Sequence, residues 1–237
     1  MWIYGRNPVR EALRAGHSGV VYVALGVEPA FLHELKELGA EVVALPRIDL
    51  DTRLRTTHHQ GVMIEVVEPR LQDPDQALRK AKERHELPLL VLLDRISDPR
   101  NFGAILRTAE ALGAHGVIIE RSKSAPLSAV AIKASAGAAT QVVLAQVANL
   151  PSYIKEIKEQ GIWVYGTAPE APKLLEQADF KRPLALVMGS EGEGMRRLVR
   201  ERCDELFAIT MTGHTASLNV AVALGITLYQ AQLGRKP

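Results

Sequence analysis

The stretch Leu89-Leu90-Val91-Leu92-Leu93-Asp94 is a continuous apolar run that ends in a carboxylate. Strands of a parallel sheet are covered on both faces and are therefore apolar throughout, whereas half-exposed strands alternate apolar and polar residues. Behind the polar residues 95–101, apolar side chains recur at helical spacing from Phe102 to Leu112, and Gly113 supplies a stop signal. The stretch predicts one strand–helix unit of a parallel sheet, with Asn101 as the N-cap of the helix.

Units of the same kind recur along the chain, with strands expected near 89–93, 115–120, 142–145, 162–166, 184–188 and 205–211. Strands that alternate with helices predict a mostly parallel sheet covered by helices on both faces. Ahead of them a smaller α/β set is expected, with a helix beginning at Pro8, helices at 30–38 and 49–55, and strands at 20–25, 41–45 and 62–67. Two prolines break the periodicity at 68–74. We therefore expect a small α/β domain at 1–70, a linker and first helix at 71–87, and a larger α/β domain at 88–237.

A second informative stretch, Ser217-Leu218-Asn219-Val220-Ala221-Val222-Ala223, stands behind the expected strand at 206–211. Residues 218–228 are apolar nearly all the way round, so a helix there needs cover on more than one face. A helix N-terminus offers unpaired N–H groups and partial positive charge. Ser217 and Asn219 are residue types that either cap such an end or hydrogen-bond a ligand there, and the residues alone leave both interpretations open.

A third stretch, Gly189-Ser190-Glu191-Gly192-Glu193-Gly194, follows the strand at 184–188 and precedes a helix expected at 195–203. Three glycines in six residues allow the backbone to come close to a ligand. Their order matches neither the dinucleotide-binding pattern nor a P-loop, so the stretch does not indicate a phosphate cradle. Glu191 and Glu193 suit hydroxyl groups, amines or a cation, although an acidic residue before a helix is also favoured by the helix dipole.

Arg107 lies on the helix at 102–112, almost opposite the apolar stripe. An arginine in that position is usually solvated, so a functional role needs support from outside its own helix.

That support comes from a resemblance. Residues 93–109, 186–195 and 209–223 resemble, in order and approximate spacing, the three motifs of the SpoU (TrmH-like) RNA ribose 2′-O-methyltransferases of the SPOUT superfamily. Residues 3–9 and 59–62 resemble the start and end of the small substrate-binding domain found in one branch, which methylates a guanosine of large-subunit ribosomal RNA. Many relatives have Pro where Thr210 stands and Ser where Ala221 stands, which bears on subfamily detail.

The resemblance implies a SPOUT catalytic domain with a C-terminal trefoil knot, preceded by a small α/β domain of the kind found in ribosomal protein L30e. It implies S-adenosylmethionine as methyl donor and a homodimer acting on a guanosine of 23S ribosomal RNA or its precursor particle. A transfer RNA substrate and a non-catalytic RNA-binding protein are the alternatives. The residues carried over as catalytic are Arg107, Asn101, Glu191, Ser217 and Asn219, and those for the donor pocket are Thr167, Gly189, Gly192, Ile209, Met211 and Leu218. A guanidinium has a pKa above about 12, so we favour an electrostatic clamp over a general base for Arg107.

Composition sets the remaining expectations. The chain has 237 residues, 47% hydrophobic and 24% charged, as in a globular protein. Cys203 is the only cysteine, which excludes an intramolecular disulfide and a thiolate zinc cluster, and the pair His58-His59 has no further ligand pattern beside it, so we expect no metal. No signal peptide and no membrane span are recognised, and we expect a cytoplasmic protein without a membrane partner.

The net charge of +2 is too small to indicate nucleic-acid binding by itself. The RNA interpretation therefore depends on motifs and on local basic patches, for which the candidates are Arg47, Arg53, Arg55, Arg121, Lys123, Lys133, Arg196, Arg197, Arg200 and Arg202.

Overall fold

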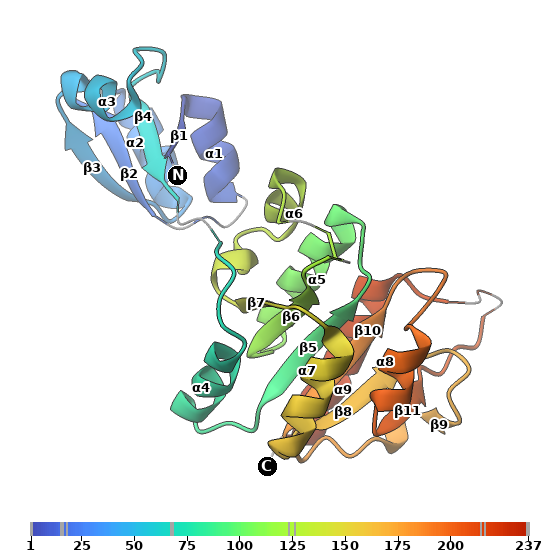
Figure 1. Cartoon of the computed structure of the whole chain (residues 1–237). Coiled ribbons are helices and arrows are strands. Elements are labelled where there is room, and N and C mark those ends of the chain that lie inside the picture. The colour runs from blue at the N-terminus through green and yellow to red at the C-terminus, as the bar shows by residue number, and fades with distance from the viewer. Residues whose placement is uncertain are drawn as a thin grey trace. The chain divides into compact units, whose positions relative to one another are not determined.

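The computed structural model describes residues 2–14, 17, 19–66, 69–122, 124–125, 127–213, 215 and 217–235. The chain forms two compact units, Met1–Glu68 and Pro69–Pro237 (Figure 1). Each unit has its own sheet and its own apolar core. Among the described residues no helix is long and apolar enough to cross a membrane.

The first unit is a four-stranded sheet with helices on both faces. Its elements are β1 (Trp2–Tyr4), α1 (Arg6–Arg14), β2 (Val20–Ala24), α2 (Pro29–Glu37), β3 (Glu41–Leu45), α3 (Arg47–Leu54) and β4 (Val62–Glu65). The strand order is β1-β4-β2-β3, in which only β2 and β3 run parallel. One face packs against α1 and α2 through Val9 and Phe31, and the opposite face packs against α3 through Leu50. The three-residue strand β1 is too short to show a periodicity and was not expected.

The second unit is built on one seven-stranded parallel sheet. Its elements are α4 (Asp75–Glu83), β5 (Leu89–Asp94), α5 (Pro99–Ala111), β6 (Gly116–Glu120), α6 (Ala129–Ala134), β7 (Val143–Val147), α7 (Leu150–Glu159), β8 (Trp163–Thr167), β9 (Lys173–Leu174), β10 (Leu184–Gly189), α8 (Arg197–Arg202), β11 (Glu205–Ala208) and α9 (Val220–Arg235), with short 3-10 turns at Ala138–Thr140 and Leu175–Gln177. The strand order is β7-β6-β5-β10-β8-β11-β9, and all paired strands are parallel. The predicted α/β class with a mostly parallel sheet is confirmed. The trefoil knot stays a prediction.

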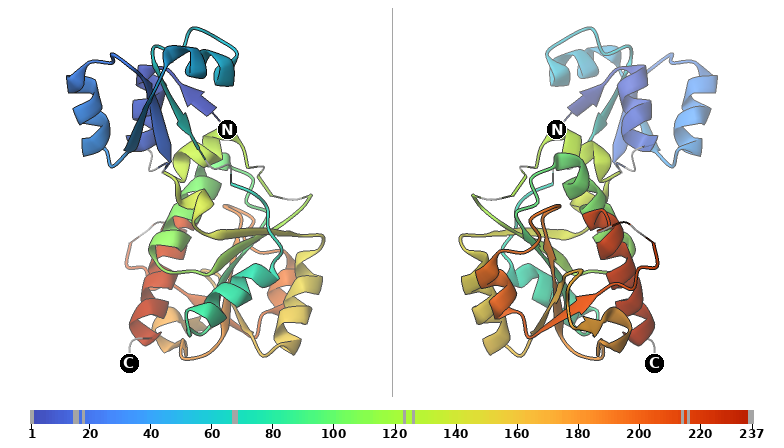
Figure 2. Two further views of the ribbon diagram at one scale, coloured as in Figure 1. Left: turned by 90° about the vertical axis from the view of Figure 1, so that its left-hand side faces the viewer. Right: turned by 90° about the vertical axis from the view of Figure 1, so that its right-hand side faces the viewer.

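Helices cover both faces of this sheet, as Figures 1 and 2 show. One core joins alternate strand residues such as Val91 and Leu186 to α5 and α9. The other joins Leu90 and Ala185 to α4, α7 and α8. All six residues of β5 are buried, as its uninterrupted apolar pattern predicts for a central strand.

Several boundaries differ from the sequence expectation. The helix α5 begins at Pro99, and its N-cap is Asp98, whose carboxylate accepts a hydrogen bond from the N–H of Arg100 at 2.8 Å. The assignment of Asn101 as N-cap is therefore wrong, because a proline at the first helical position has the backbone angle that starts a helix earlier. The strand β11 ends at Ala208, so residues 209–211 lie in a loop, and α8 begins at Arg197.

The proposed linker is partly built into the second unit. The N–H of Gln72 donates to the carbonyl oxygen of Leu144 at 2.8 Å, so the backbone at Gln72 lies beside β7. Val67 and Glu68 lie outside the described residues.

Candidate active site

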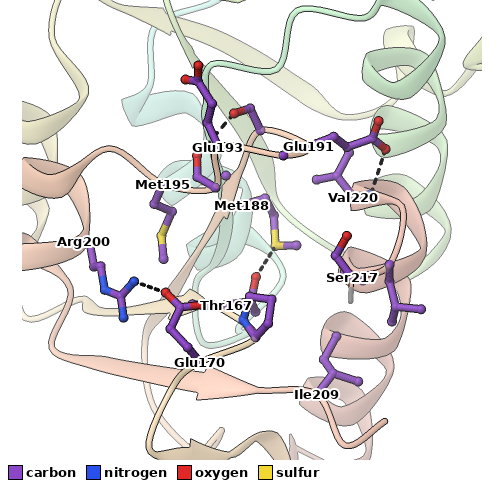
Figure 3. Close-up of a pocket in the computed structure, with 18 of the residues that line it drawn as sticks. Thr167, Glu170, Met188, Glu191, Glu193, Met195, Arg200, Ile209, Ser217 and Val220 are labelled. Carbon is purple, nitrogen blue, oxygen red and sulfur yellow. Dashed lines mark hydrogen bonds and ion pairs between the residues drawn. The ribbon is translucent and has the colours of Figure 1, made fainter. Parts of the chain in front are cut away.

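A pocket of about 550 Å³ lies at the carboxyl ends of β8 and β10 (Figure 3). Loops that follow parallel strands gather at this edge of a sheet, which is where α/β proteins bind small molecules. The wall is formed by the end of β8, the glycine loop 189–194, the first turn of α9, and four residues between β11 and α9, namely Ile209, Met211, Ser217 and Leu218. All six residues carried over for the donor pocket line it, namely Thr167, Gly189, Gly192, Ile209, Met211 and Leu218. Their assignment to a particular ligand stays a prediction.

The glycine loop closes on itself at the rim of the pocket. Ser190 and Gly194 exchange backbone hydrogen bonds of 3.1 and 2.9 Å, and Gly192 and Gly194 have φ angles of +85° and +68°. A Cβ added at Gly189 would stand 2.3 Å from the carbonyl carbon of Gly194 and from the nitrogen of Met195. Glycine at 189 is therefore required by the loop's own backbone, which packs directly on this residue.

Arg196 anchors the same loop to the sheet. Its backbone N–H and its Nε donate to the two carboxylate oxygens of Asp94 at 2.7 and 2.6 Å, and its guanidinium also donates to Glu120. Asp94 and Glu120 are buried at the ends of β5 and β6. Burial lowers the pKa of the Arg196 guanidinium, but its hydrogen bonds to Glu120 and Asp94 outweigh that effect and raise it. Arg196 was one of the basic candidates for contact with RNA phosphate, but its side chain is instead committed to this internal cluster.

Asn219 joins the three motifs. Its Nδ2 donates to Glu191 Oε1 at 2.6 Å and to Asn101 Oδ1 at 2.9 Å. Its Oδ1 accepts from the N–H groups of Ala221 and Val222 at 3.0 and 3.4 Å, so Asn219 caps the helix that begins at Val220. The catalytic candidates Asn101, Glu191 and Asn219 thus form one hydrogen-bonded cluster, built from α5, the glycine loop and α9.

The contacts of this cluster show which of the candidate polar residues lie at the N-terminus of α9 and which face the pocket. Ser217 is exposed and lines the pocket, whereas Asn219 supplies the cap of α9. Glu191 accepts from the N–H of Val220 at 3.4 Å, so its carboxylate lies at the N-terminus of α9, where the helix dipole favours negative charge (Figure 3). Glu193 instead pairs with Arg95 at 2.8 Å.

Sequence reasoning missed several residues of the pocket. Met188 and Met195 line it, and Thr167 Oγ1 donates to the sulfur of Met188 at 3.6 Å. At the opposite rim Arg200 pairs with Glu170 (Figure 3). Hydrogen bonds from Arg200 and from the backbone lower the pKa of Glu170. No motif indicates this pair, because Glu170 lies in the loop after β8 and Arg200 lies on α8, 30 residues further along the chain.

Arg107 lies apart from both the pocket and the hydrogen-bonded cluster around Asn219. It is exposed on α5, does not line the pocket, and makes no ion pair or hydrogen bond with any side chain in the part of the chain described. Its neighbour Thr108 packs toward α9, where a Cβ at Gly225 would be 3.6 Å from Thr108 Cγ2. Arg107 therefore lies on a helix that packs against α9, and its own side chain is exposed to solvent.

The helix α9 carries an uncovered apolar stripe. Val220, Leu224 and Leu228 are buried in the core, but Val222, Ile226, Tyr229 and Leu233 are 36–56% exposed. These four are spaced by three or four residues, so they share one face of the helix. The sequence predicts that α9 is covered on more than one face. In the described part of this chain, only the face of α9 that packs on the core is covered.

The remaining basic candidates differ in their surroundings. Arg121 is exposed at the end of β6, and Arg197 and Arg202 are exposed on α8. Lys123 and the side chain of Lys133 lie outside the described residues. No group of three His, Cys, Asp or Glu residues that could hold a metal ion occurs among the residues described.

Comparisons with known proteins agree in both units. A family model described as the SpoU rRNA Methylase family matches residues 88–229, and one described as RNA 2′-O ribose methyltransferase substrate binding matches residues 2–72. The 23S rRNA (guanosine-2′-O-)-methyltransferase RlmB of Photorhabdus laumondii is 43% identical over 235 residues, covering 97% of this chain and 96% of that protein. RlmB of Vibrio vulnificus is 41% identical over 236 residues, covering 97% and 95%.

Among solved structures, the SpoU methyltransferase AviRb from Streptomyces viridochromogenes, in complex with the cofactor AdoMet, has a TM-score of 0.68 at 26% identity and covers 99% of this chain and 90% of its own. A parallel sheet with a pocket at its carboxyl edge is the arrangement in which α/β proteins bind small molecules. The family model and the relatives also identify the family. The chain belongs to the SpoU rRNA methylase family.

Proposed function

We propose that this chain is an S-adenosylmethionine-dependent RNA ribose 2′-O-methyltransferase that acts on a guanosine of 23S ribosomal RNA. The observation that carries the proposal is the Asn219 cluster, which joins the glycine loop to α5 and α9 at the edge of the pocket. Relatives named as 23S rRNA (guanosine-2′-O-)-methyltransferases cover nearly the whole chain at 41–43% identity.

The pocket fits the methyl donor by its chemistry. Apolar side chains of Ile209, Met211 and Leu218 can enclose the adenine, and the backbone at Gly189 and Gly192 can hydrogen-bond its edge. Glu170 and Glu191 supply carboxylates that suit the positive charges of the donor. When bound, S-adenosylmethionine supplies an activated methyl group for attack by an oxygen nucleophile.

The chain's own residues have two tasks in such a reaction. Alignment of two bound reactants can contribute about 7–11 kcal/mol, and we assign it to the cluster of Asn101, Glu191 and Asn219 with the nearby Ser217. The second task is to stabilise the ribose oxygen as it becomes alkoxide-like. We assign that to Arg107, which clamps the phosphate beside the target ribose and keeps its own proton, while the proton of the ribose hydroxyl leaves to bulk water as the methyl group is transferred.

The position of Arg107 and the stripe on α9 support the proposal of a homodimer. The stripe of Val222, Ile226, Tyr229 and Leu233 is large and apolar for a helix facing water, and Arg107 stands on the adjoining helix. We propose that a second copy covers this stripe and that Arg107 completes a cleft shared by both copies. Sedimentation of the purified protein at micromolar concentration tests this, and a monomer would contradict it.

We assign RNA presentation to the first unit, in keeping with the substrate-binding model that matches residues 2–72. The protein would then work in the cytoplasm, on ribosomal RNA or its precursor particle. A transfer RNA substrate is the alternative within the enzyme class, and a non-catalytic RNA-binding protein is the alternative outside it.

Methyl transfer to purified RNA separates these possibilities. The protein is incubated with labelled S-adenosylmethionine and either ribosomal or transfer RNA from cells that lack it. We expect label in 23S RNA. Label confined to transfer RNA would favour the alternative enzyme, and binding of donor and RNA without transfer would favour the non-catalytic protein.

A further inference from the structure

The arginines on the two faces of the first unit's sheet differ in whether they form ion pairs within the unit. On the side of α1 and α2, the arginines of α1 pair with carboxylates of this unit, at 2.7 Å for Arg6–Glu28, 2.7 Å for Arg10–Glu34 and 3.9 Å for Arg14–Glu34. Hydrogen bonding between Arg10 and Glu34 raises the pKa of the first and lowers that of the second. The three arginines of α1 therefore already have carboxylate partners within the unit.

On the side of α3 the arginines are unpaired. Arg47 begins α3, Arg53 lies in its last turn, and Arg55 follows directly after it. None of the three forms an ion pair with another residue in the described part of the chain. The Arg53 guanidinium instead lies over the ring of Tyr22, 4.9 Å from its centroid. Three exposed cations are left for a partner that carries negative charge.

Aromatic side chains gather on this same face. Tyr22 and Trp2 meet edge to face, with ring centroids 5.7 Å apart, and both belong to the cluster packed under α3. Tyr4 stands two residues beyond Trp2 on β1, so strand alternation gives it the same face, and it is 42% exposed. Tyr4 and Tyr22 occupy one row of the sheet, because both are in register with Met63 of β4.

We propose that this face, formed by Trp2, Tyr4, Tyr22 and Arg53, is a stacking platform for unpaired nucleotides of the RNA substrate. The inference rests on the proposed function, since it names the form of RNA that the first unit accepts. Aromatic rings and arginine planes that stand partly exposed on a sheet stack unpaired bases, whereas bases inside a duplex are already stacked on one another. Unpaired cations beside the rings suit the phosphates of the same strand.

The charges around the platform also orient the RNA. Glu65 is in register with Trp2 at the β1 edge of the sheet and is exposed. Its carboxylate would repel a phosphate but can accept a hydrogen bond from a base amino group. We therefore assign the RNA backbone to Arg47 and Arg55 at the two ends of α3, and the bases to the rings of β1 and β2 and the guanidinium plane of Arg53.

Fluorescence of Trp2 in the full-length chain tests the platform. The only other tryptophan, Trp163, lies on β8 of the second unit under Arg182, so Trp163→Phe leaves Trp2 as the sole reporter. This protein is titrated with a short unstructured oligoribonucleotide and, separately, with a duplex of the same sequence. We expect the unpaired strand to quench Trp2 and to bind at least about 10-fold more tightly than the duplex.

Substitutions on the two faces supply the control. Tyr4→Ala and Arg53→Ala should each weaken binding of the unpaired strand about 5-fold or more, because each removes a stacking surface. The matched control is Arg14→Ala on the opposite face, which should leave binding within about 2-fold. Circular dichroism of each variant checks that it is folded.

Several results would overturn the proposal. They are bound RNA, seen by anisotropy, without any change in Trp2 emission; equal affinity for duplex and single strand; and a larger loss from Arg14→Ala than from Tyr4→Ala. A defect of the Tyr4 variant that appears with ribosomal particles but not with naked RNA would assign the face to a protein partner, and would overturn it as well. Failure of methyl transfer by the unsubstituted protein is scored separately and bears on the proposed function alone.

Discussion

We assign stabilisation of the transition state to Arg107, although this residue lies outside the donor pocket. We expect Arg107→Ala to lower turnover by about 10² or more, because the guanidinium is assigned to the developing alkoxide. Donor binding should stay within a few-fold, because the side chain does not line the pocket. Methyl incorporation measures the first and calorimetry the second.

The matched control is Glu110→Ala, one turn further along the exposed face of α5. It should keep nearly full activity. Wild-type turnover in the Arg107 variant would remove Arg107 from the mechanism.

Arg196 and its neighbour Arg197 offer a second test at the level of single residues. Arg196→Ala removes the cation that pairs with the buried carboxylate of Asp94 and also with Glu120, which costs about 3–5 kcal/mol of folding stability. Arg197→Ala removes a side chain that is 90% exposed, and should change stability by less than about 0.5 kcal/mol. Urea denaturation of the two variants compares them, and equal stabilities would show that the buried cluster does not hold the glycine loop.

The motifs predicted which residues would line the pocket but not what Arg196 does. Thr167, Gly189 and Met211 were identifiable because the resemblance to the methyltransferase family carries them over. Arg196 was not, because its partners stand 102 and 76 residues earlier in the chain. The choice of Asp98 over Asn101 as N-cap depended on Pro99, since both residues are of capping type.

At the scale of elements, the close approach of the glycine loop to the end of β10 gives a sharp test. Gly189→Val should abolish donor binding, because its Cβ would force away the backbone of Gly194 and Met195, which forms the pocket rim. Gly213→Ala is the control, because a Cβ there meets nothing within 4 Å. Calorimetry with S-adenosylmethionine measures both, and retained binding in a folded Gly189 variant would contradict the pocket as described.

A buried histidine connects the residues before β5 to β6. The N–H of Leu89 donates to Nδ1 of His115 at 3.0 Å, and Nε2 of His115 lies 2.9 Å from Glu86. Burial lowers the pKa of His115, as do Arg235 and Arg84, while Glu86 opposes the shift. The folded protein therefore takes up its proton at a lower pH than the unfolded chain, whose histidine titrates near about 6.5.

The direction of the change in stability with pH follows from the lowered pKa of His115. Below about pH 6.5 the unfolded chain binds more protons than the folded one, so stability falls with falling pH until the lowered pKa is reached. We expect the melting temperature to drop between about pH 7.5 and 5.5, and His115→Asn to reduce that slope. His33→Asn changes an exposed histidine and should leave the slope intact. An unchanged slope in the His115 variant would assign the effect elsewhere, for instance to His17, whose pKa burial also lowers.

Long, uniformly apolar strands were predictable at this scale, and short ones were not. β5 and β10 are buried along nearly their whole length, so composition alone indicates them. β1 and β9 have three and two residues and exist only because longer strands pair with them. The expected extension of β11 to residue 211 failed because pairing with β8 and β9 ends by Ala208.

At the scale of the whole molecule, the two compact units give a truncation experiment. A chain that starts at Pro69 keeps the hydrogen bond from Gln72 to β7, and should fold and bind the methyl donor. It should lose most activity on ribosomal RNA through weaker substrate binding. Unchanged kcat/KM at the same RNA site would show that the first unit does not recognise substrate.

The division into a small and a large α/β part followed from a change of periodicity and two prolines. The uncovered stripe on α9 also has a sequence signal, since the helix is apolar nearly all round. What no pattern in one chain specifies is which copy or molecule covers the stripe, because a partner leaves no spacing of its own in the sequence.

The most direct test of the central claim is the identity of the methylated nucleoside. Purified protein transfers a labelled methyl group to 23S RNA from cells that lack the enzyme, and the RNA is digested to nucleosides and separated by mass. The account predicts label on the ribose of guanosine, as 2′-O-methylguanosine, and its loss with Arg107→Ala. Label on a base, or on the ribose of another nucleoside, would contradict it.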